Sequence, residues 1–460
     1  MLWKQCFSLI NTIGFPPNLE SSVKKLWSLR LTLLSDKVNT YNDASDEVLS
    51  SQQPSEQATK PQVKVLAKWE TKYMPTLIET LALLYLSAIQ LRLPVRIGDF
   101  HRYAVKEDIP YIRAIRFVPE TITKGLPADS RLALDTTSPL APDHLRKAVH
   151  NLCLLYQHHF AMQFAPLNGP PLIFKYVKDL AMPLNVFRPT LELADMLGIK
   201  FSFPIPKGRQ RASHLPEIAL VCLFVVAVKL HHPFDSQPRT VVSDEDPAIL
   251  ALDWEVWSRA REEHRARLTR TGRLERGSEI KVTEDHVFQM TGEQMDDYLD
   301  WYERTWVDDE RAEHKPHGVP DDLLKMFPTG RQDGSRPEQY SYNEDMDREE
   351  ASTVTRIQET MSQLAVRETV QGEEKNNKPV GSMYKRYRTM EDLTKYARAF
   401  HEEVAEVAAI RVETLLSAVL QVENRILAWR RQQLKSKDGQ ADEEEGSEGE
   451  QSDVDMFDDG

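Results

Sequence analysis

Two apolar stretches decide the fold of this chain: PTLIETLALLYLSAIQLRLPV at residues 75–95 and PEIALVCLFVVAVKLHHPF at residues 216–234. Each begins at a proline, is apolar on nearly every side when wound as a helix, and ends at a proline soon after a basic residue. A helix that is apolar all round has to be surrounded by other helices. The two stretches therefore indicate two similar helical domains, each with one central helix. The alternative is that two unrelated buried helices merely look alike.

Around these stretches the sequence predicts one helix after another, with few alternating strand patterns, so the expected fold class is all-α. The expected flanking helices are residues 2–13, 19–34, 63–73, 144–162, 171–180, 190–197 and 249–268. A later amphipathic helix is expected over residues 290–310, with Met295, Tyr298, Leu299, Tyr302 and Trp306 along one side. The residues expected in the two cores include Leu83, Leu84, Ile89, Leu220, Phe224 and Val225.

Polar segments separate these elements. Residues 35–62 are expected to form a flexible loop, residues 126–141 an inter-domain linker and residues 311–389 a mostly disordered linker. A long amphipathic helix is expected over residues 390–434, and its apolar stripe predicts packing on a partner or back onto the body of the protein. Residues 435–460 are expected to be a disordered acidic tail.

The net charge of −13 argues at first against nucleic-acid binding. However, residues 442–460 carry ten acidic residues and no basic one, so this tail accounts for most of the net charge. The rest of the chain can therefore hold local basic patches. In the tail, Ser447 and Ser452 are candidates for phosphorylation, because each has an acidic residue three positions later.

The sequence offers no residues on which to base an enzyme hypothesis. Phosphate-binding, dinucleotide-binding and nucleophile-elbow motifs are absent from the sequence. Cys6, Cys153 and Cys222 form no CxxC pair, which predicts neither a disulfide framework nor a zinc ribbon in this chain, and no cofactor. Cys153 and Cys222 are interpreted as small buried hydrophobic residues.

Two adjacent histidine pairs, His158–His159 and His231–His232, are poor metal sites, since neighbours on a helix point about 100° apart. For His231–His232 we expect a capping or surface role instead. The longest apolar stretches are too short or too interrupted to cross a bilayer, and the sequence shows no signal peptide, so we expect no membrane association.

Two basic stretches are candidate contacts to DNA phosphates. The first lies in a loop that prolines and a glycine keep from becoming helical, and carries Lys207, Arg209 and Arg211. The second consists of Arg259, Arg261, Arg265, Arg267, Arg270, Arg273 and Arg276. The alternative for the second is a solvated helix face with ion pairs between residues four apart. DNA binding by these stretches is expected to be weak and salt-sensitive.

Several segments also resemble a known family. LIETLALLYLSAIQLRLPVRIGDFHRYAVKEDIPYIRAI (residues 77–115) resembles the first cyclin repeat of the TFIIB-like subunit of the fungal RNA polymerase I core factor. The animal counterpart is the TFIIB-like subunit of the promoter selectivity factor. Residues 2–31 are similar to the stretch that leads into this repeat. Residues 169–187 and 215–235 resemble the second repeat, and the helix over residues 290–307 also resembles this family. The resemblance covers roughly residues 2–309.

This resemblance implies two tandem cyclin-type repeats, over residues 1–125 and 142–310. It implies a nuclear and nucleolar initiation factor that assembles with other core-factor subunits, binds the ribosomal DNA core promoter and recruits RNA polymerase I, with the TATA-binding protein as a further candidate partner. The family normally begins with a zinc ribbon, whereas Met1 here lies directly at the first helix, so we expect this ribbon to be missing. The alternative function is that of a cyclin-like regulatory subunit of a protein kinase, because cyclin repeats serve both roles.

Overall fold

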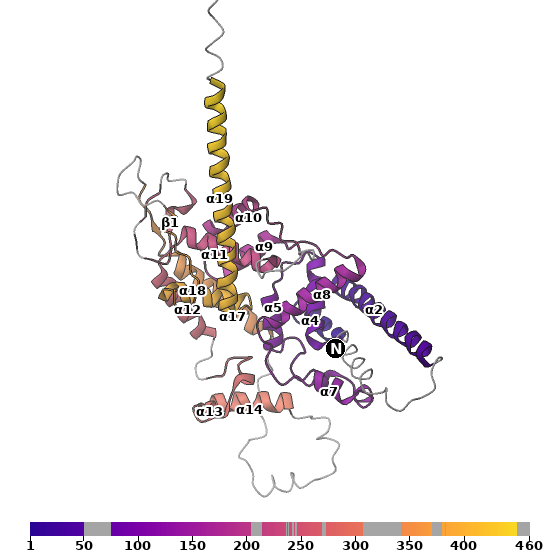
Figure 1. Cartoon of the computed structure of the whole chain (residues 1–460). Helices are drawn as coiled ribbons and strands as arrows, with labels where there is room; N and C mark the ends of the chain where they lie inside the picture. Colours follow the sequence, from indigo (N-terminus) through magenta and orange to yellow (C-terminus); the bar gives the residue numbers. More distant parts are fainter. Residues whose placement is uncertain are drawn as a thin grey trace, which may run out of the picture. The chain divides into compact units, whose positions relative to one another are not determined.

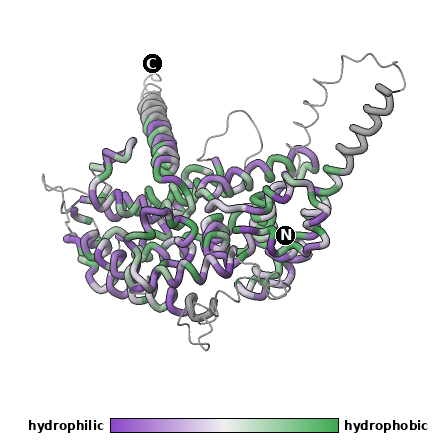
Figure 2. The backbone as a smooth tube through the Cα atoms, turned by 90° about the horizontal axis from the view of Figure 1, so that it is seen from below, coloured by the Kyte–Doolittle hydropathy of each residue, from purple (hydrophilic) through white to green (hydrophobic). Residues whose placement is uncertain are grey.

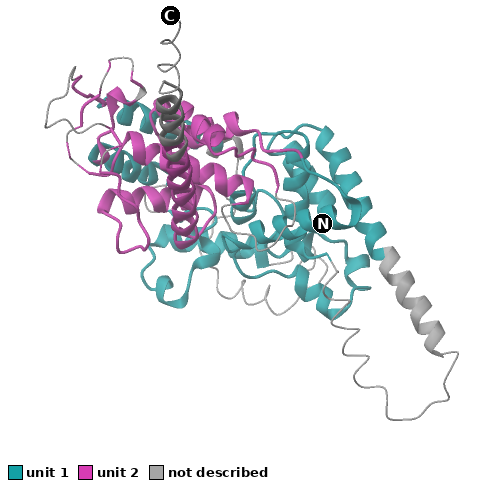
Figure 3. Ribbon diagram, turned by 45° about the horizontal axis from the view of Figure 1, so that its top comes forward, with its two compact units in different colours: residues 1–164, 255–363 teal, residues 165–254, 364–460 magenta. Residues whose placement is uncertain are grey.

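The computed structural model describes residues 1–49, 75–203, 214–268, 273–306, 342–369 and 380–448, apart from residues 236, 238, 242, 244, 245 and 382. The chain divides into two compact units, residues 1–164 with 255–363 and residues 165–254 with 364–460 (Figure 3). Each unit holds one of the two apolar stretches as its central helix. Within the described residues, helices predominate and the strands are limited to one pair of two-residue strands. The all-α prediction is confirmed.

Unit 1 is organised around α4 (Leu77–Gln90), which occupies the first apolar stretch. Every residue from Leu81 to Ile89 is buried, including the predicted core residues Leu83 and Leu84. The helices α8 (His144–Phe160), α2 (Asn18–Leu49) and α1 (Leu2–Asn11) pack against α4. The other elements of this unit are α5 (Ile97–Val105), η1 (Ala114–Phe117), α6 (Glu120–Thr123), α7 (Ala128–Leu134), α12 (Trp254–Leu268) from Glu255 onward, η5 (Glu279–Lys281), α13 (Glu284–Val287), α14 (Gly292–Trp306) and α17 (Tyr342–Met361).

Unit 2 is organised around α11 (Pro216–His231), which occupies the second apolar stretch. Its residues from Pro216 to Lys229 are all buried, and the predicted core residues Leu220, Phe224 and Val225 are 0% exposed. The helices α19 (Val412–Glu448), α10 (Phe187–Met196) and α9 (Gly169–Asp179) pack against α11. The other elements are η2 (Leu184–Val186), η4 (Pro247–Ile249), β1 (Leu250–Ala251), β2 (Ala365–Val366), which pairs antiparallel with β1, and α18 (Lys395–Val407).

The end of the chain completes the second core. The single helix predicted over residues 390–434 is two helices, α18 and α19, separated at Ala408–Arg411. Ala409 has a φ of +48°, and the backbone N–H groups of Ala409 and Ile410 donate to the carbonyls of Glu406 and Ala405, which is the hydrogen-bond pattern of a Schellman cap. This turn folds the apolar stripe back onto α11, which is the second of the two arrangements that the sequence left open.

α19 is also longer than predicted. It continues to Glu448, so residues 435–448, which were predicted to be part of a disordered tail, have a helical backbone. Its 37 residues correspond to about 55 Å at 1.5 Å per residue, and the helix runs well past the other elements of its unit (Figure 1). Hydrophobic and hydrophilic positions alternate along most helices, as expected where one face is packed (Figure 2).

Three of the predicted boundaries need correction. Residues 35–49, predicted as loop, continue α2, and the predicted linker of residues 126–141 contains α7. The region of residues 311–389, predicted as mostly disordered, contains α17 and β2. α8 packs on α4 in unit 1. The predicted helix over residues 63–73 lies outside the described residues.

The predicted inward face of α14 is only partly correct. The buried residues are Trp301 and Thr305, whereas Leu299 and Tyr302 are exposed. Trp301 Nε1 donates to Glu107 Oε1 (2.9 Å), and Arg113 Nη1 donates to the carbonyls of Thr305 (3.0 Å) and Trp306 (3.2 Å) at the end of the helix. A cation at this position complements the helix dipole. α14 is therefore oriented by polar contacts in unit 1 that hydrophobic periodicity does not reveal.

Candidate nucleic-acid interface

The predicted arginine stretch begins on α12, whose inner face packs against α17. Trp257 is 0% exposed, and the guanidinium of Arg356 lies 5.4 Å from the centre of its ring. His264 Nδ1 and Ser352 Oγ are 2.8 Å apart, which links the same two helices. One side of α12 is therefore occupied by α17 and is not available to DNA.

Most of the arginines in this stretch are engaged inside unit 1. Arg261 is 8% exposed. Arg267 pairs with Glu263 (3.1 Å) on its own helix and with Glu359 (2.5 Å) on α17. The Arg267–Glu263 pair is the contact between residues four apart that the alternative for this stretch expects, and the Arg267–Glu359 pair adds a contact to α17.

The later arginines of the stretch are also paired. Arg273 contacts Asp297 (3.0 Å), and Arg276 contacts Asp108 (3.0 Å). Burial raises the pKa of Asp108 to about 6, although the neighbouring Arg276 opposes this rise. Next to Arg276, Gly277 has a φ of +87°, and a Cβ atom there would lie 3.0 Å from Val105, so glycine permits this close approach.

Of the predicted DNA contacts, the described structure leaves Arg259 and Arg265 with exposed side chains on α12. Lys207, Arg209, Arg211 and Arg270 lie outside the described residues, as does Ser452, and Ser447 is described only as part of the backbone of α19. Among the described residues, the predicted contacts that remain exposed are therefore Arg259 and Arg265.

A third basic segment, which was not among the predicted DNA contacts, follows residue 383. Residues 384–388 read YKRYR, and the residues up to 398 add Lys395 and Arg398. The side chains of Lys385, Arg386, Arg388, Lys395 and Arg398 are all exposed. We name these five cations the 385–398 surface. Alternation of tyrosine with basic residues was the available signal, but residues 384–389 were predicted to lie in the disordered linker and residues 390–398 at the start of the long amphipathic helix.

Beneath this surface lies a buried ion pair. Lys229 of α11 and Glu423 of α19 are both almost fully buried, and Lys229 Nζ lies 2.5 Å from Glu423 Oε1. The same carboxylate oxygen accepts the hydroxyl of Tyr384 (2.6 Å). Lys229 Nζ also lies 4.5 Å from the ring centre of Tyr384 and 4.7 Å from that of Tyr387. Burial lowers the pKa of Lys229, and the Glu423 carboxylate opposes this shift.

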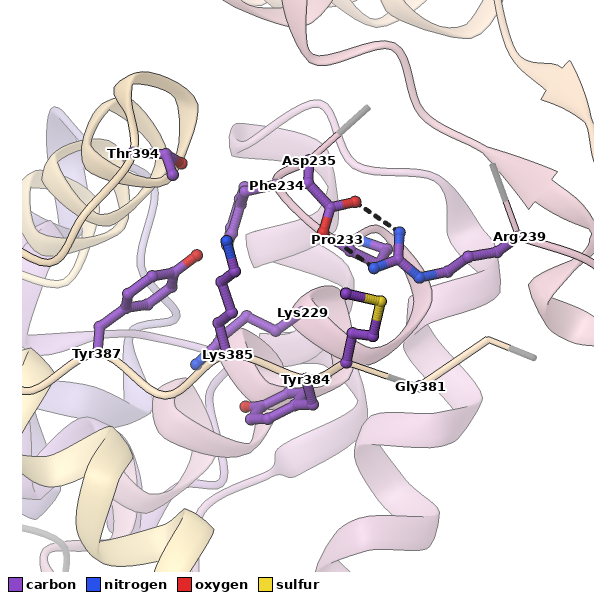
Figure 4. A pocket seen from close by; sticks show the side chains of 11 residues that line it. Lys229, Pro233, Phe234, Asp235, Arg239, Gly381, Tyr384, Lys385, Tyr387 and Thr394 are labelled. Atoms are coloured by element: carbon purple, nitrogen blue, oxygen red, sulfur yellow. Dashed lines mark hydrogen bonds and ion pairs between the residues drawn. The ribbon is translucent and has the colours of Figure 1, made fainter. Parts of the chain in front are cut away.

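A pocket opens beside this pair (Figure 4). It is lined by Lys229, Pro233, Phe234, Asp235, Arg239, Gly381, Met383, Tyr384, Lys385, Tyr387 and Thr394. Both carboxylate oxygens of Asp235 are held by Arg239, at 2.6 and 3.0 Å, and these hydrogen bonds are the main reason that the pKa of Asp235 is lowered. The acidic group in the pocket is therefore already neutralised.

The three cysteines are free and buried, as interpreted for Cys153 and Cys222, and burial raises the pKa of the Cys153 thiol to about 12. Of the capping or surface role expected for His231–His232, capping holds for His232, which is the C-cap residue of α11. His232 is 1% exposed, and its Nε2 donates to Asn185 Oδ1 (3.1 Å). Among the residues that the structure describes, no three His, Cys, Asp or Glu side chains are grouped as metal ligands, and no helix is long and apolar enough to cross a membrane.

Buried neutral histidines make unit 2 sensitive to acid. Burial lowers the pKa of His232 to about 3 and that of His401 to about 4, and the nearby cations Arg367 and Lys229 respectively act in the same direction. Unfolded histidines bind a proton near pH 6.5. Stability should therefore be fully present above about pH 6.5 and fall as the pH decreases toward the folded pKa values, by up to about 1.4 kcal/mol per pH unit for each ring.

Hydrogen–deuterium exchange of α11 and α18 between pH 7 and pH 5, corrected for the intrinsic exchange rate, would measure this loss. Replacing the exposed His158 and His159 by glutamine should leave the pH dependence unchanged. Constant protection of α11 and α18 over this pH range would contradict the prediction.

Two family models match the chain in tandem. The N-terminal cyclin domain of Rrn7/TAF1B matches residues 1–120, and the C-terminal cyclin domain of Rrn7/TAF1B matches residues 138–306. Together these matches cover more than half of the chain. They include the central helix of each unit, but neither extends to α18 or α19.

Curated proteins show the same likeness. The chain is 21% identical to the RNA polymerase I-specific transcription initiation factor rrn7 of Schizosaccharomyces pombe over 361 residues, which is 71% of this chain and 64% of that protein. It is 28% identical to a TATA box-binding protein-associated factor of RNA polymerase I from Xenopus tropicalis over 177 residues, which is 36% of this chain and 29% of that protein. The matched region thus spans less than two thirds of either relative.

A solved structure shares the fold. One chain of the Saccharomyces cerevisiae core factor crystal structure matches with a TM-score of 0.51 and 16% sequence identity. The match covers 93% of this chain and 94% of that chain. At this identity the comparison concerns the fold, and it includes the regions beyond residue 306 that the family models leave out.

Proposed function

The chain belongs to the Rrn7/TAF1B family, and from this membership we propose that it acts in transcription initiation by RNA polymerase I at the ribosomal DNA promoter. The observation that carries the proposal is the tandem match of both cyclin domains, at residues 1–120 and 138–306. A role in binding and assembly needs no catalytic residue. The alternative of a cyclin-like kinase regulator is not favoured, because both matched relatives are named as RNA polymerase I factors.

The proposed partners are the other subunits of a core factor, RNA polymerase I and the ribosomal DNA core promoter. The fold likeness to a chain of the yeast core factor over nearly its whole length supports the first of these. The name of the Xenopus relative supports the TATA-binding protein as a further partner. The proposed location is the nucleus, and within it the nucleolus.

Affinity capture and chromatin immunoprecipitation of the tagged full chain would test this proposal. We expect RNA polymerase I and core-factor subunits in the captured material, and enrichment of the ribosomal DNA promoter over a promoter of RNA polymerase II. Capture of a protein kinase without polymerase I, together with no enrichment at ribosomal DNA, would contradict the proposal and support the kinase alternative.

For DNA binding, Lys207, Arg209 and Arg211 remain proposed contacts, and so do Arg259 and Arg265. Reversing the charges of the first three to glutamate should lower the salt slope of DNA binding by the assembled factor by about three, roughly one unit for each phosphate contact. A matched control reverses three exposed lysines of unit 1, Lys25, Lys124 and Lys147. An affinity and salt slope equal to those of the control would show that the loop is not a DNA site.

A further inference from the structure

The 385–398 surface carries more positive than negative charge. Its five cations share their segment with two acidic residues, Glu391 and Asp392. Asp392 Oδ2 accepts the backbone N–H groups of Arg388 (3.0 Å) and Thr389 (2.9 Å), and these hydrogen bonds lower the pKa of the carboxyl. The acid next to Lys385 across the pocket is Asp235, which is already held by Arg239. The segment therefore presents excess positive charge to solvent.

Buried contacts hold this segment in place. Tyr384 is anchored on Glu423, and Tyr387 is 7% exposed beside Lys229. Lys229 Nζ lies near the rings of both tyrosines, and Figure 4 shows Tyr384, Lys385 and Tyr387 on one stretch of backbone. Farther out, Arg386 Nη1 donates to Asn424 Oδ1 of α19 (3.1 Å). The cations are thus attached to a fixed backbone, which reduces the entropy lost when they bind.

The chemistry of the surface favours a phosphate backbone over a protein partner. Interfaces between proteins have an apolar centre and are depleted in lysine. Among the described residues of 383–398, the exposed large hydrophobic side chain is that of Met383. The other groups offered to solvent are mainly ammonium and guanidinium, which are the groups that contact DNA phosphates.

We propose that the 385–398 surface binds the sugar–phosphate backbone of double-stranded DNA, as a contact additional to the one proposed for Lys207, Arg209 and Arg211. This inference rests on the proposed function, because it gives an initiation factor a further point at which it holds DNA. The contact is made to phosphates, so it does not depend on base sequence.

The test measures DNA binding by the full chain in its assembled factor as a function of salt. The variant carries Lys385→Glu, Arg388→Glu and Lys395→Glu, and the control carries Lys25→Glu, Lys124→Glu and Lys147→Glu. We expect the variant to lose about three units of salt slope and roughly 10²- to 10³-fold in affinity near 0.1 M salt, equally on promoter and unrelated DNA. The control should keep the wild-type slope.

A second variant, in which the same three residues become glutamine, excludes effects of charge repulsion on folding, and it should show the same loss of slope. An unchanged slope would overturn the inference, as would a loss confined to promoter DNA. Retained DNA binding with lost capture of RNA polymerase I would assign the surface to an acidic protein instead. Failure of the proposed function is seen separately, as absence of wild-type chain from the ribosomal DNA promoter.

Discussion

A chain that ends after residue 379 is expected to lose the native fold of unit 2, because α18 and α19 supply part of its core. The deletion removes the buried side chains of Phe400, Val404, Leu415, Leu416, Val419 and Val422, none of which is more than 3% exposed. Each contributes about 1.5–3 kcal/mol through burial. Their sum is comparable to the entire free energy of unfolding of a domain, about 5–15 kcal/mol.

Hydrogen–deuterium exchange of the shortened chain should show that α11 has lost its protection, while α4 in unit 1 keeps it. A chain that ends after Leu434 is the matched control and should behave like the full chain. A point substitution tests the same packing more gently: Phe400→Ala should cost about 3–5 kcal/mol, whereas Leu434→Ala, at a side chain that is 52% exposed, should change stability by less than about 0.5 kcal/mol. Native protection of α11 without α18 and α19 would show that these helices are not part of the core.

The second large effect is expected at the buried pair Lys229–Glu423. Lys229→Met leaves the Glu423 carboxylate buried without its cation, which should destabilise unit 2 by about 3–5 kcal/mol. The double variant Lys229→Met with Glu423→Met should be more stable than the single variant, because it removes both charges together. The hydroxyl of Tyr384 then loses its acceptor, so recovery should be incomplete unless Tyr384→Phe is added.

Chemical denaturation, followed by hydrogen–deuterium exchange at α11, gives the free energy of unfolding of each variant. Together with the single variant Glu423→Met, these values complete a double-mutant cycle. The exposed pair Arg188–Glu192 on α10 provides the comparison, and its removal should cost at most about 0.5 kcal/mol. If the effects of Lys229→Met and Glu423→Met simply add, the two groups do not interact in the folded protein.

The core could be predicted largely from the sequence, whereas the candidate site could not. The two helices that are apolar on all sides, residues 75–95 and 216–234, led correctly to α4 and α11 and to their buried leucines. The arginine stretch of residues 259–276 was left open between DNA contact and a solvated face with local ion pairs. The sequence could not show its more distant acidic partners Asp108, Asp297 and Glu359, because they lie far away along the chain. The basic residues after 384 were overlooked, because residues 384–389 were predicted to be disordered and Lys395 and Arg398 were assigned to a helix for which only the apolar stripe was considered.

The sequence by itself determined the all-α class, the two central helices and the buried cysteines, because these follow from local periodicity and from the removal of apolar side chains from water. The tertiary structure alone decided which cations are neutralised internally and that α18 and α19 fold back onto α11. Pairing of charges and placement of an amphipathic stripe depend on which distant segments meet. The amino-acid sequence shows which face of a helix gains free energy when it is buried, but it does not show which other segment covers that face.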